Sequence, residues 1–327
     1  MAKRAQGTGT QRGKAAAATP AKRWLCLIAA AVLLICFILL EIGQRYPQSG
    51  LPGWDTLYAW AGLDDGTPAP EGTLEVHAID VGNADSLLIS QGDRHMLIDA
   101  GEKGDGDTVV SYLRQHGVER LDLVIATHPH ADHIGGMATV IRSIPIDRFI
   151  MATMPQGSTP TSKVYRDMLT ALDEQNVTVT EAEPEAVYRL GSAQVTLLAP
   201  LEETDEPNDM SVVSRVDFGK RSFLFMGDAE KDVEKLMLER YPDLHADVIK
   251  VGHHGSSTAS TDAFIAAVAP KYAIVTCGEG NSYGHPHKEA IAVLKKYGVE
   301  IWRCDTDGSI RFSTDGDTLS VKGSKGE

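Results

Sequence analysis

THPHADHIGG, residues 127–136, is the most informative run of this sequence. It directly follows LDLVIA, residues 121–126, a run that is typical of a buried strand. His128 and His130 are therefore predicted to project from the loop after the strand, and Asp132 and His133 to open a helix. Imidazole and carboxylate groups are ligands that Zn²⁺, Mn²⁺ and Fe²⁺ accept in proteins. Four such groups within six residues predict a site for one or two adjacent divalent ions.

Two further histidine clusters also come after predicted buried strands. His253 and His254 follow residues 247–251, and His285 and His287 follow residues 272–276. Binding sites in layered α/β proteins gather at the ends of strands, so we expect the three clusters to meet at one edge of the fold. The remaining histidines have no partners in sequence and are predicted to be ordinary surface or interface residues: His77, His95, His116 and His245.

The pattern of apolar residues predicts one large α/β domain over residues 73–323. A strand-rich first half with inserted helices is followed by a second half of similar style, which fits two mixed sheets, each covered by helices. The strands are expected at residues 74–80, 85–90, 95–99, 121–126, 149–153, 177–180, 194–198, 212–218, 222–226, 247–251, 272–276, 300–304, 309–313 and 318–322. The helices are expected at residues 108–116, 132–144, 164–175, 230–240, 262–268 and 288–297.

The motif HxHxDH at residues 128–133, with the motifs that follow it, resembles the metallo-β-lactamase superfamily over residues 73–321. The resemblance implies a four-layer αββα sandwich. It implies that Asp99, in LIDAG, orients metal ligands without binding an ion itself. It also implies that Asp228, in FLFMGDAE, bridges two ions, and that one of His253 and His254, in KVGHHGS, is the last ligand.

Within the superfamily, the chain most resembles the extracellular hydrolase domain of the competence DNA-uptake channel ComEC and its stand-alone relatives. The runs that carry this resemblance are DVGNADSLLI (80–89), NDMSVV (208–213), FLFMGD (223–228), KVGHHGS (250–256) and NSYGHP (281–286). The multi-span channel domain has no counterpart here, since the sequence has only one long apolar run. The uptake-channel role is therefore not expected to carry over.

The resemblance implies a first metal position at His128, His130 and Asp228 that is one histidine short. Most superfamily members have a further histidine ahead of the bridging aspartate, but none occurs here between His133 and His245. Asn208 or Asp209 lies where the missing ligand would come from. Asn208 could ligate through its amide oxygen or hydrogen-bond a water on the ion, or Asn208 and Asp209 could simply form a turn.

The second metal position is better supplied. It comprises Asp132, His133, Asp228 and one of His253 and His254. Spacing relative to Gly255 slightly favours His254, and the other histidine is then expected to support the ligands from behind. Zn²⁺ is the expected ion and Mn²⁺ the alternative, with one or two ions bound.

Residues near the last histidine cluster are candidates for contact with substrate. Asn281, Ser282, Tyr283 and His285 could hold a substrate phosphate or protonate a leaving group, or they could form a purely structural loop. Ser256 is a weaker candidate for binding an oxyanion.

The predicted reaction is attack of a metal-activated water on an electrophilic phosphorus or carbonyl. Asp132 or Asp228 would take a proton during the step, and His285 or Tyr283 would stabilise the departing oxygen.

The N-terminal region predicts a membrane anchor. Residues 24–40 read WLCLIAAAVLLICFILL, and with Ile42 this run suffices to cross a thin bilayer. Six basic residues precede it, which predicts a cytoplasmic, disordered leader over residues 1–23 and an external C-terminal part. A cleaved signal peptide is the alternative, but the run is long and no small-residue cleavage site follows. Residues 43–72, rich in Pro, Gly and Asp, are predicted to link anchor and domain.

Charge narrows the choice of substrates. Residues 1–42 hold six basic residues and one acidic residue, a net +5 against −14 for the whole chain, so the remainder carries −19. Such a charge disfavours avid binding of long polyanions without a local basic groove. We therefore expect a phosphodiester-type substrate: a small molecule, a wall-linked group or single-stranded nucleic acid. Hydrolysis of a β-lactam or lactone, and a non-catalytic surface module with a decayed site, are the alternatives. No sequence feature predicts a protein partner.

Overall fold

The computed structural model describes residues 34–39, 42, 72–155 and 157–325. The chain divides into two units, Met1–Tyr58 and Ala59–Glu327. In the first unit, residues 34–39 and 42 are helical and exposed. Within the described ranges, no helix is long and apolar enough to cross a membrane. The predicted leader, anchor and linker otherwise lie outside the described residues, apart from Gly72.

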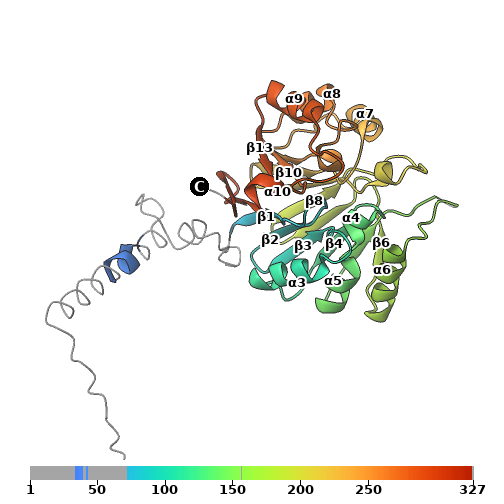
Figure 1. Ribbon diagram of the computed structural model, residues 1–327, viewed down its shortest axis with the longest axis horizontal. Helices are drawn as coiled ribbons and strands as arrows, with labels where there is room; N and C mark the ends of the chain where they lie inside the picture. The colour runs from blue at the N-terminus through green and yellow to red at the C-terminus, as the bar shows by residue number, and fades with distance from the viewer. Residues whose placement is uncertain (1–33, 40–41, 43–71, 156, 326–327) are drawn as a thin grey trace, which may run out of the picture. The chain divides into compact units, whose positions relative to one another are not determined.

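The second unit is built on two sheets (Figure 1). The first sheet has eight strands in the order β15-β14-β1-β2-β3-β4-β5-β6. Their bounds are β15 Leu319–Gly323, β14 Ile310–Thr314, β1 Leu74–Ala78, β2 Leu87–Gln91, β3 Arg94–Ile98, β4 Leu123–Ala126, β5 Phe149–Met151 and β6 Val179–Glu181. Strands β3 to β6 run parallel to one another, and the remaining pairs are antiparallel.

The second sheet has seven strands in the order β13-β12-β11-β10-β9-β8-β7. Their bounds are β13 Glu300–Arg303, β12 Tyr272–Val275, β11 Val248–Lys250, β10 Arg221–Phe225, β9 Ser214–Phe218, β8 Ala193–Leu197 and β7 Val187–Leu190. Strands β10 to β13 are parallel. Strands β11 and β12 are buried along their whole length, as expected for parallel strands covered on both faces.

Helices cover the outer face of each sheet, which makes four layers (Figure 1). On the first sheet lie α3 Gly106–Gln115, α5 Met137–Ser143 and α6 Lys163–Glu174. On the second lie α7 Lys231–Arg240, α8 Asp262–Val268 and α9 Lys288–Lys296. The predicted sandwich of two helix-covered sheets is confirmed.

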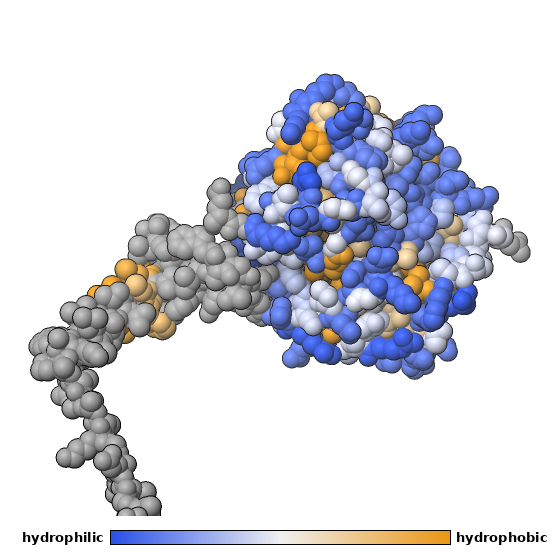
Figure 2. Space-filling model, viewed as in Figure 1, coloured by the Kyte–Doolittle hydropathy of each residue, from blue (hydrophilic) through white to orange (hydrophobic). Residues whose placement is uncertain are grey.

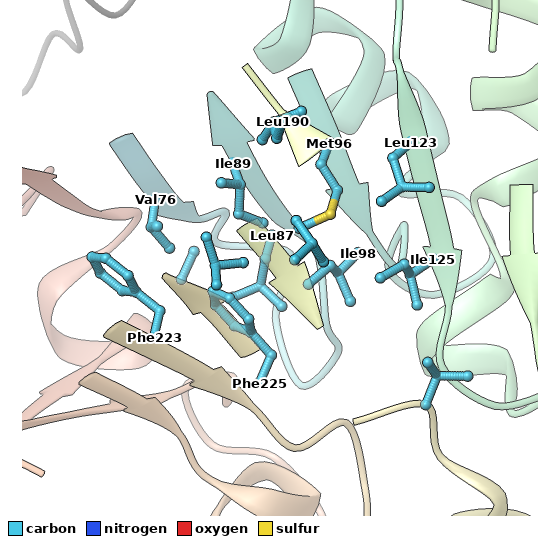
Figure 3. Close-up of a cluster of buried hydrophobic side chains, with 14 of the residues drawn as sticks. Val76, Leu87, Ile89, Met96, Ile98, Leu123, Ile125, Leu190, Phe223 and Phe225 are labelled. Atoms are coloured by element: carbon cyan, nitrogen blue, oxygen red, sulfur yellow. The ribbon is translucent and has the colours of Figure 1, made fainter. Parts of the chain in front are cut away.

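The main core lies between the two sheets. Figure 3 shows Leu87, Ile89 and Met96 of the first sheet facing Phe223 and Phe225 of the second. Burying one such side chain stabilises the fold by roughly 1.5–3 kcal/mol, so this layer of side chains holds the two sheets against each other. The surface drawn in Figure 2 is mostly hydrophilic, with only small separate apolar patches.

The single helix predicted over residues 132–144 is wrong. Two helices, α4 Ala131–Ile134 and α5, are separated at Gly135 and Gly136. A β-carbon on Gly135 would lie 2.2 Å from the backbone nitrogen of Lys103, and one on Gly136 would lie 2.2 Å from the carbonyl oxygen of Ala100. The loop after β3 therefore needs both glycines, because it passes directly over the helix break.

Three histidines predicted to be ordinary surface or interface residues are buried instead. His77 on β1 faces α3, with its Nδ1 2.9 Å from the hydroxyl of Tyr112 and its Nε2 3.2 Å from Glu75. His116 and His95 are also buried, and His95 Nδ1 lies 2.9 Å from the Ser90 hydroxyl. The imidazoles of His77 and His95 have polar partners on neighbouring elements, and their spacing in sequence did not indicate these partners.

The loops that carry the histidine clusters meet at the carboxyl ends of parallel strands. The loop 127–130 follows β4, and the loops holding Asp228 and His253–His254 follow β10 and β11. Residues 276–287 follow β12. Strands β10, β11 and β12 are parallel in the second sheet, so their loops lie at one edge of it. His128 and His133, which follow β4 of the first sheet, reach Asp228 at the same place.

Candidate metal centre

Four side chains, from helix α4 and from the segments after β10 and β11, face one another at this edge and make up the second metal position. His133 Nε2 lies 3.2 Å from Asp228 Oδ1, and His254 Nε2 lies 3.5 Å from Asp228 Oδ2. Asp132 Oδ2 is 3.4 Å from His254 Nε2 and 4.0 Å from His133 Nε2. One ligand atom from each of the four lies within 4.8 Å of the others, so the group could hold a metal ion. His254, and not His253, belongs to this group.

Three buried ligand atoms of the second metal position lack hydrogen-bond partners. His133 Nε2, Asp228 Oδ1 and His254 Nε2 are buried atoms without a hydrogen-bond partner. Buried polar atoms in proteins are nearly always paired, so three such atoms around one point require an explanation. A divalent ion supplies it, because imidazole nitrogen and carboxylate oxygen are the donors such an ion takes. The residues therefore fit a metal ion.

Asp99 holds His133 in place for this role. Its Oδ2 lies 2.7 Å from His133 Nδ1, which leaves Nε2 to face Asp228. Asp99 also accepts hydrogen bonds from the backbone nitrogen and the hydroxyl of Thr127, at 2.8 and 2.6 Å. A carboxylate behind a ligating imidazole fixes its orientation and tautomer. The geometry at Asp99 is that of an orienting residue.

A buried ion pair that the sequence did not single out supports the other side of the group. Lys250 on β11 pairs with Asp85, and its ammonium donates to the Gly227 carbonyl oxygen at 2.8 Å, next to Asp228. Asp85 Oδ1 lies 3.3 Å from His254 Nδ1, which is also 2.8 Å from the Thr276 carbonyl oxygen. A lysine in an otherwise apolar interior strand was the available signal, since a buried charge requires a partner.

Protonation in this group reflects its carboxylates. Burial disfavours a charged imidazole at His133, but Asp228 and Asp99 outweigh burial and raise its pKa to about 10. At Asp132, burial is outweighed by the facing imidazoles of His254 and His133, and the pKa is lowered to about 2. The ionised carboxylates thus favour protons on the imidazoles of His133 and His254. A divalent cation that displaced these protons would neutralise the same carboxylates.

The first metal position is more open. His128 is buried, and its Nε2 lies 3.9 Å from Asp228 Oδ2. His130 is exposed, and its Nδ1 lies 3.0 Å from His128 Nε2. His128 Nδ1 has the hydroxyls of Thr127 and Ser211 at 3.2 and 3.5 Å behind it. His128 and His130 therefore lie close together on the loop after β4, with His128 nearest to the shared carboxylate.

Asn208 and Asp209 lie in a short 3₁₀ turn, Pro207–Met210, and contact Glu230. Asn208 Nδ2 donates to Glu230 Oε1 at 3.1 Å and lies 3.5 Å from His253 Nδ1. Asp209 Oδ1 accepts from the Glu230 backbone nitrogen at 3.4 Å. The turn that the sequence left as an alternative is thus present. Its side chains contact the residue that holds His253.

The loop after β12 brings His285 to the histidines. Its ring centroid lies 6.0 Å from that of His254 and 5.5 Å from that of His253. Burial and the neighbouring His254, His253 and His287 lower the pKa of His285 to about 4, so the ring is neutral near pH 7. Its Nδ1 is buried and has no hydrogen-bond partner. A neutral ring suits a hydrogen-bonding role better than proton donation as an imidazolium.

The other candidates for substrate contact divide into two kinds. Tyr283 is 69% exposed and stacks on His285 with ring centroids 5.7 Å apart. Ser282 is exposed on the same loop. Asn281 shapes the loop: its amide donates to the carbonyls of Gly278 and His285 and accepts from the His285 nitrogen. Ser256 is buried, and its hydroxyl accepts from Thr258 within its own turn.

A model of the metallo-beta-lactamase superfamily matches residues 79–279, which include the loops after β4, β10 and β11 but not residues 280–287 of the loop after β12. The chain belongs to the metallo-beta-lactamase superfamily. Membership supports a metal-dependent hydrolase at the level of the superfamily. The predicted family is confirmed.

Curated relatives fit the predicted competence-protein branch of the superfamily. The chain is 30% identical to ComE operon protein 3 of Bacillus subtilis over 259 residues, 73% of this chain and 33% of that protein. It is 29% identical to competence protein ComA of Neisseria gonorrhoeae over 286 residues, 86% of this chain and 38% of that protein. Recombination protein 2 of Haemophilus influenzae is 28% identical over 256 residues, 76% of this chain and 30% of that protein. The chain thus spans about a third of the length of these relatives.

Solved structures with low sequence identity share the fold. The metallo-beta-lactamase fold protein YhfI from Bacillus subtilis has a TM-score of 0.50 at 16% identity, covering 74% of this chain and all of that one. CmlA, a diiron beta-hydroxylase from Streptomyces venezuelae, has a TM-score of 0.50 at 18% identity, covering 84% and 62%. Because a fold can host different chemistries, the function of this chain has to be argued from its site.

Proposed function

We propose that this chain is a membrane-anchored, extracytoplasmic metallo-hydrolase that cleaves phosphodiester bonds. The observation that carries the metal-dependent part is the second metal position, where buried ligand atoms of His133, Asp228 and His254 lie close together and lack hydrogen-bond partners. The phosphodiester part is supported by the competence and recombination relatives, whose names refer to processes that act on DNA. Zn²⁺ is the proposed ion, with Mn²⁺ as the alternative.

The roles of the side chains follow from their positions. A divalent ion bound there supplies Lewis acidity and lowers the pKa of the water that it binds. Asp132 and Asp228, both with a lowered pKa, are carboxylates near pH 7, so either could hold an ion and could hold a proton at its carboxylate during the reaction. Tyr283 is exposed over His285, so a substrate that reaches the site meets its ring first. His285 can then share a hydrogen bond with an oxygen of the scissile group.

Activity on a panel of substrates tests the reaction class. Purified full-length protein with Zn²⁺ or Mn²⁺ is expected to hydrolyse bis-p-nitrophenyl phosphate, and single-stranded DNA can be tested beside it. Nitrocefin and a lactone serve as the comparison. Turnover of either of these without turnover of any phosphodiester would overturn the proposed substrate class, and unchanged activity in Asp228→Ala and His128→Ala would overturn the metal mechanism.

The charge of the chain refines the substrate. With −19 outside the N-terminal 42 residues, a long polyanion is repelled, which favours a small or tethered phosphodiester. Rates on a dinucleotide and on a long single strand at low ionic strength separate these cases. Salt should raise the rate on the long strand more than on the dinucleotide.

The anchor is proposed from the apolar run at residues 24–40 and the six basic residues before it. The protein is expected in the membrane fraction, with its C-terminal domain digested by protease added to spheroplasts. Full protection from protease would overturn the external location. Recovery in the soluble fraction would overturn the anchor.

A further inference from the structure

Tyr283, in the segment after β12, is 69% exposed, more than any other large hydrophobic side chain of the described residues. A single exposed aromatic residue is ordinary on a protein surface, so its surroundings have to show whether it has a role. Tyr297, for comparison, is 37% exposed at the end of α9, and its hydroxyl donates to Asp262 at 2.9 Å. Tyr297 therefore has a structural contact, and Tyr283 has a different kind of neighbour.

Two ring contacts connect Tyr283 to the second metal position. The ring centroid of Tyr283 lies 5.7 Å from that of His285, with the ring planes 19° apart. The centroid of His285 lies 6.0 Å from that of His254, with the planes 24° apart. His254 Nε2 in turn faces Asp132 and Asp228, at 3.4 and 3.5 Å. The exposed ring is therefore separated from the second metal position by a single imidazole.

The segment that carries Tyr283 is fixed to the turn Gly252–Gly255. The backbone nitrogen of His287 donates to the Gly255 carbonyl oxygen at 2.9 Å. His287 Nδ1 accepts from the backbone nitrogen of Ser257 at 2.9 Å, so its Nε2 carries the proton and donates to the Tyr283 carbonyl oxygen at 3.2 Å. A preorganised group loses less freedom when a ligand binds to it, so the ring of Tyr283 is suited to stacking.

A polar atom without a partner lies beside this ring. His285 is 8% exposed, and within the part of the chain that the structure describes its Nδ1 has no hydrogen-bond partner. Buried polar atoms in proteins are nearly always paired, so a polar group of a ligand is expected to complete this one. A ligand with a flat ring and hydrogen-bonding groups would use both Tyr283 and His285.

The charge of the chain favours stacking as the source of affinity. Proteins that hold single-stranded nucleic acid combine a positively charged groove with aromatic side chains on which bases stack. Here the part after residue 42 carries a net charge of −19, so the chain as a whole repels phosphates. Stacking depends on the face of a ring, which every base has, so it can hold a base-bearing ligand on an acidic protein.

We propose that Tyr283 is a specificity-determining residue on which a base of a nucleotide phosphodiester stacks. The inference rests on the proposed function and narrows its substrate class. The substrate is then a short, base-bearing phosphodiester, and not one whose groups are only sugars, glycerol or lipid. The ring of Tyr283 carries this role, and its hydroxyl is not required.

Binding to a short single strand tests the stacking without catalysis. Full-length protein in a chelator is titrated into a fluorescein-labelled oligothymidylate and into a matched abasic strand with the same sugar–phosphate backbone, and fluorescence anisotropy is measured. The wild type should bind the oligothymidylate about 5- to 150-fold more tightly, the value of one stacked base. Tyr283→Ala should lose this preference and Tyr283→Phe should keep it. Tyr297→Ala, at another exposed tyrosine, is the matched control and should keep it as well.

Kinetics with Zn²⁺ connect the stacking to the reaction. Tyr283→Ala should raise KM for a dinucleotide about 5- to 150-fold with kcat nearly unchanged, and Tyr283→Phe should match the wild type. Equal losses in the two variants would assign the role to the hydroxyl and overturn the proposal. Equal affinity of the wild type for both strands, or binding of neither, would overturn it too, while hydrolysis of bis-p-nitrophenyl phosphate would leave the metallo-hydrolase intact. Absence of hydrolysis on every phosphodiester would instead overturn the proposed function, and the ratio of the two binding constants would then decide whether Tyr283 stacks a base.

Discussion

The second and first metal positions share Asp228 but differ in how their other side chains are held. In the second, His133 and His254 are buried, and Asp99, Asp85 and the Thr276 carbonyl fix their rings. In the first, His130 is exposed, and the hydroxyls of Thr127 and Ser211 lie behind the His128 ring at 3.2 and 3.5 Å. Burial strengthens electrostatic attraction, and exposed side chains lose more freedom on binding. We therefore expect the second position to bind its ion tightly and the first position to exchange its ion more readily.

Removing the shared carboxylate should have the largest effect. Asp228→Ala takes a ligand from both positions and should lower the hydrolysis rate by about a thousandfold or more, corresponding to roughly 4 kcal/mol or more of lost catalysis. The measurement is the rate on bis-p-nitrophenyl phosphate with metal in excess. Asp93→Asn, whose side chain is 92% exposed in a turn, is the control and should match the wild type.

Substituting a ligand of one position at a time should show which ion each position binds. His254→Ala should abolish the tight ion, while His128→Ala should remove the weaker ion and leave the tight one bound. Calorimetric titration with Zn²⁺ reports both affinities in each variant. If the two variants lose the same ion, the centre does not consist of two separate positions.

The carboxylate behind His133 should matter to one position only. Asp99→Asn replaces an acceptor of three contacts by an amide, so affinity at the second position should fall about 10- to 100-fold. Affinity at the first position should stay unchanged. An equal loss at both would indicate that Asp99 acts on the whole edge of the fold.

Metal removal should destabilise the protein measurably. An ion present at a hundred times its dissociation constant stabilises the native state by about 2.7 kcal/mol. Thermal unfolding with and without a chelator should therefore show a lower midpoint in the chelated protein. His254→Ala should lose most of this difference and His128→Ala less, because the tight ion dominates. A midpoint independent of chelator would count against both positions.

The smallest expected effect concerns the loop that carries both histidines. Glu234 of α7 accepts hydrogen bonds from the backbone nitrogens of Ser260 and Thr261, at the end of this loop. Glu234→Gln should cost about 1–3 kcal/mol of stability and weaken both ions equally. Denaturant unfolding measures the first quantity and calorimetry the second. Unequal loss at the two positions would show that the loop does not move as one piece.

Glu234 should also make the stability of the protein depend on pH. Burial raises the pKa of Glu234 above its ordinary value of 4.5, so the folded protein binds this proton more tightly than the unfolded chain does. Its contribution to stability is present at low pH and decreases as the pH rises from about 4.5 through the raised pKa. The wild-type curve of stability against pH should show this decrease relative to Glu234→Gln. Parallel curves would contradict it.

Much of the fold could be read from local patterns. Helix α8 has the predicted bounds, residues 262–268, because Thr261 caps its first turn and Pro270 follows its end. The break at Gly135 and Gly136 could not, since it exists to admit the backbone of Lys103 and Ala100 from another loop. Strand β7 was missed as well: it is a short edge strand whose pairing with β8 supplies the order that its own four residues do not indicate.

The sequence by itself determined the chemistry of this protein: three histidine clusters, two aspartates and their family resemblance predicted a divalent metal centre at strand ends. Only the tertiary structure decided which side chain serves which purpose. His253 and His254 are indistinguishable as a dipeptide, and they differ because Glu230 is behind one and Thr276 behind the other. Asp85 and Lys250 are 165 residues apart in sequence. They form a buried ion pair beside Asp228 because the fold places β11 next to the segment that carries Asp85. The physical reason is that ligand type is a property of a residue, whereas orientation and charge balance depend on neighbours that the fold brings together.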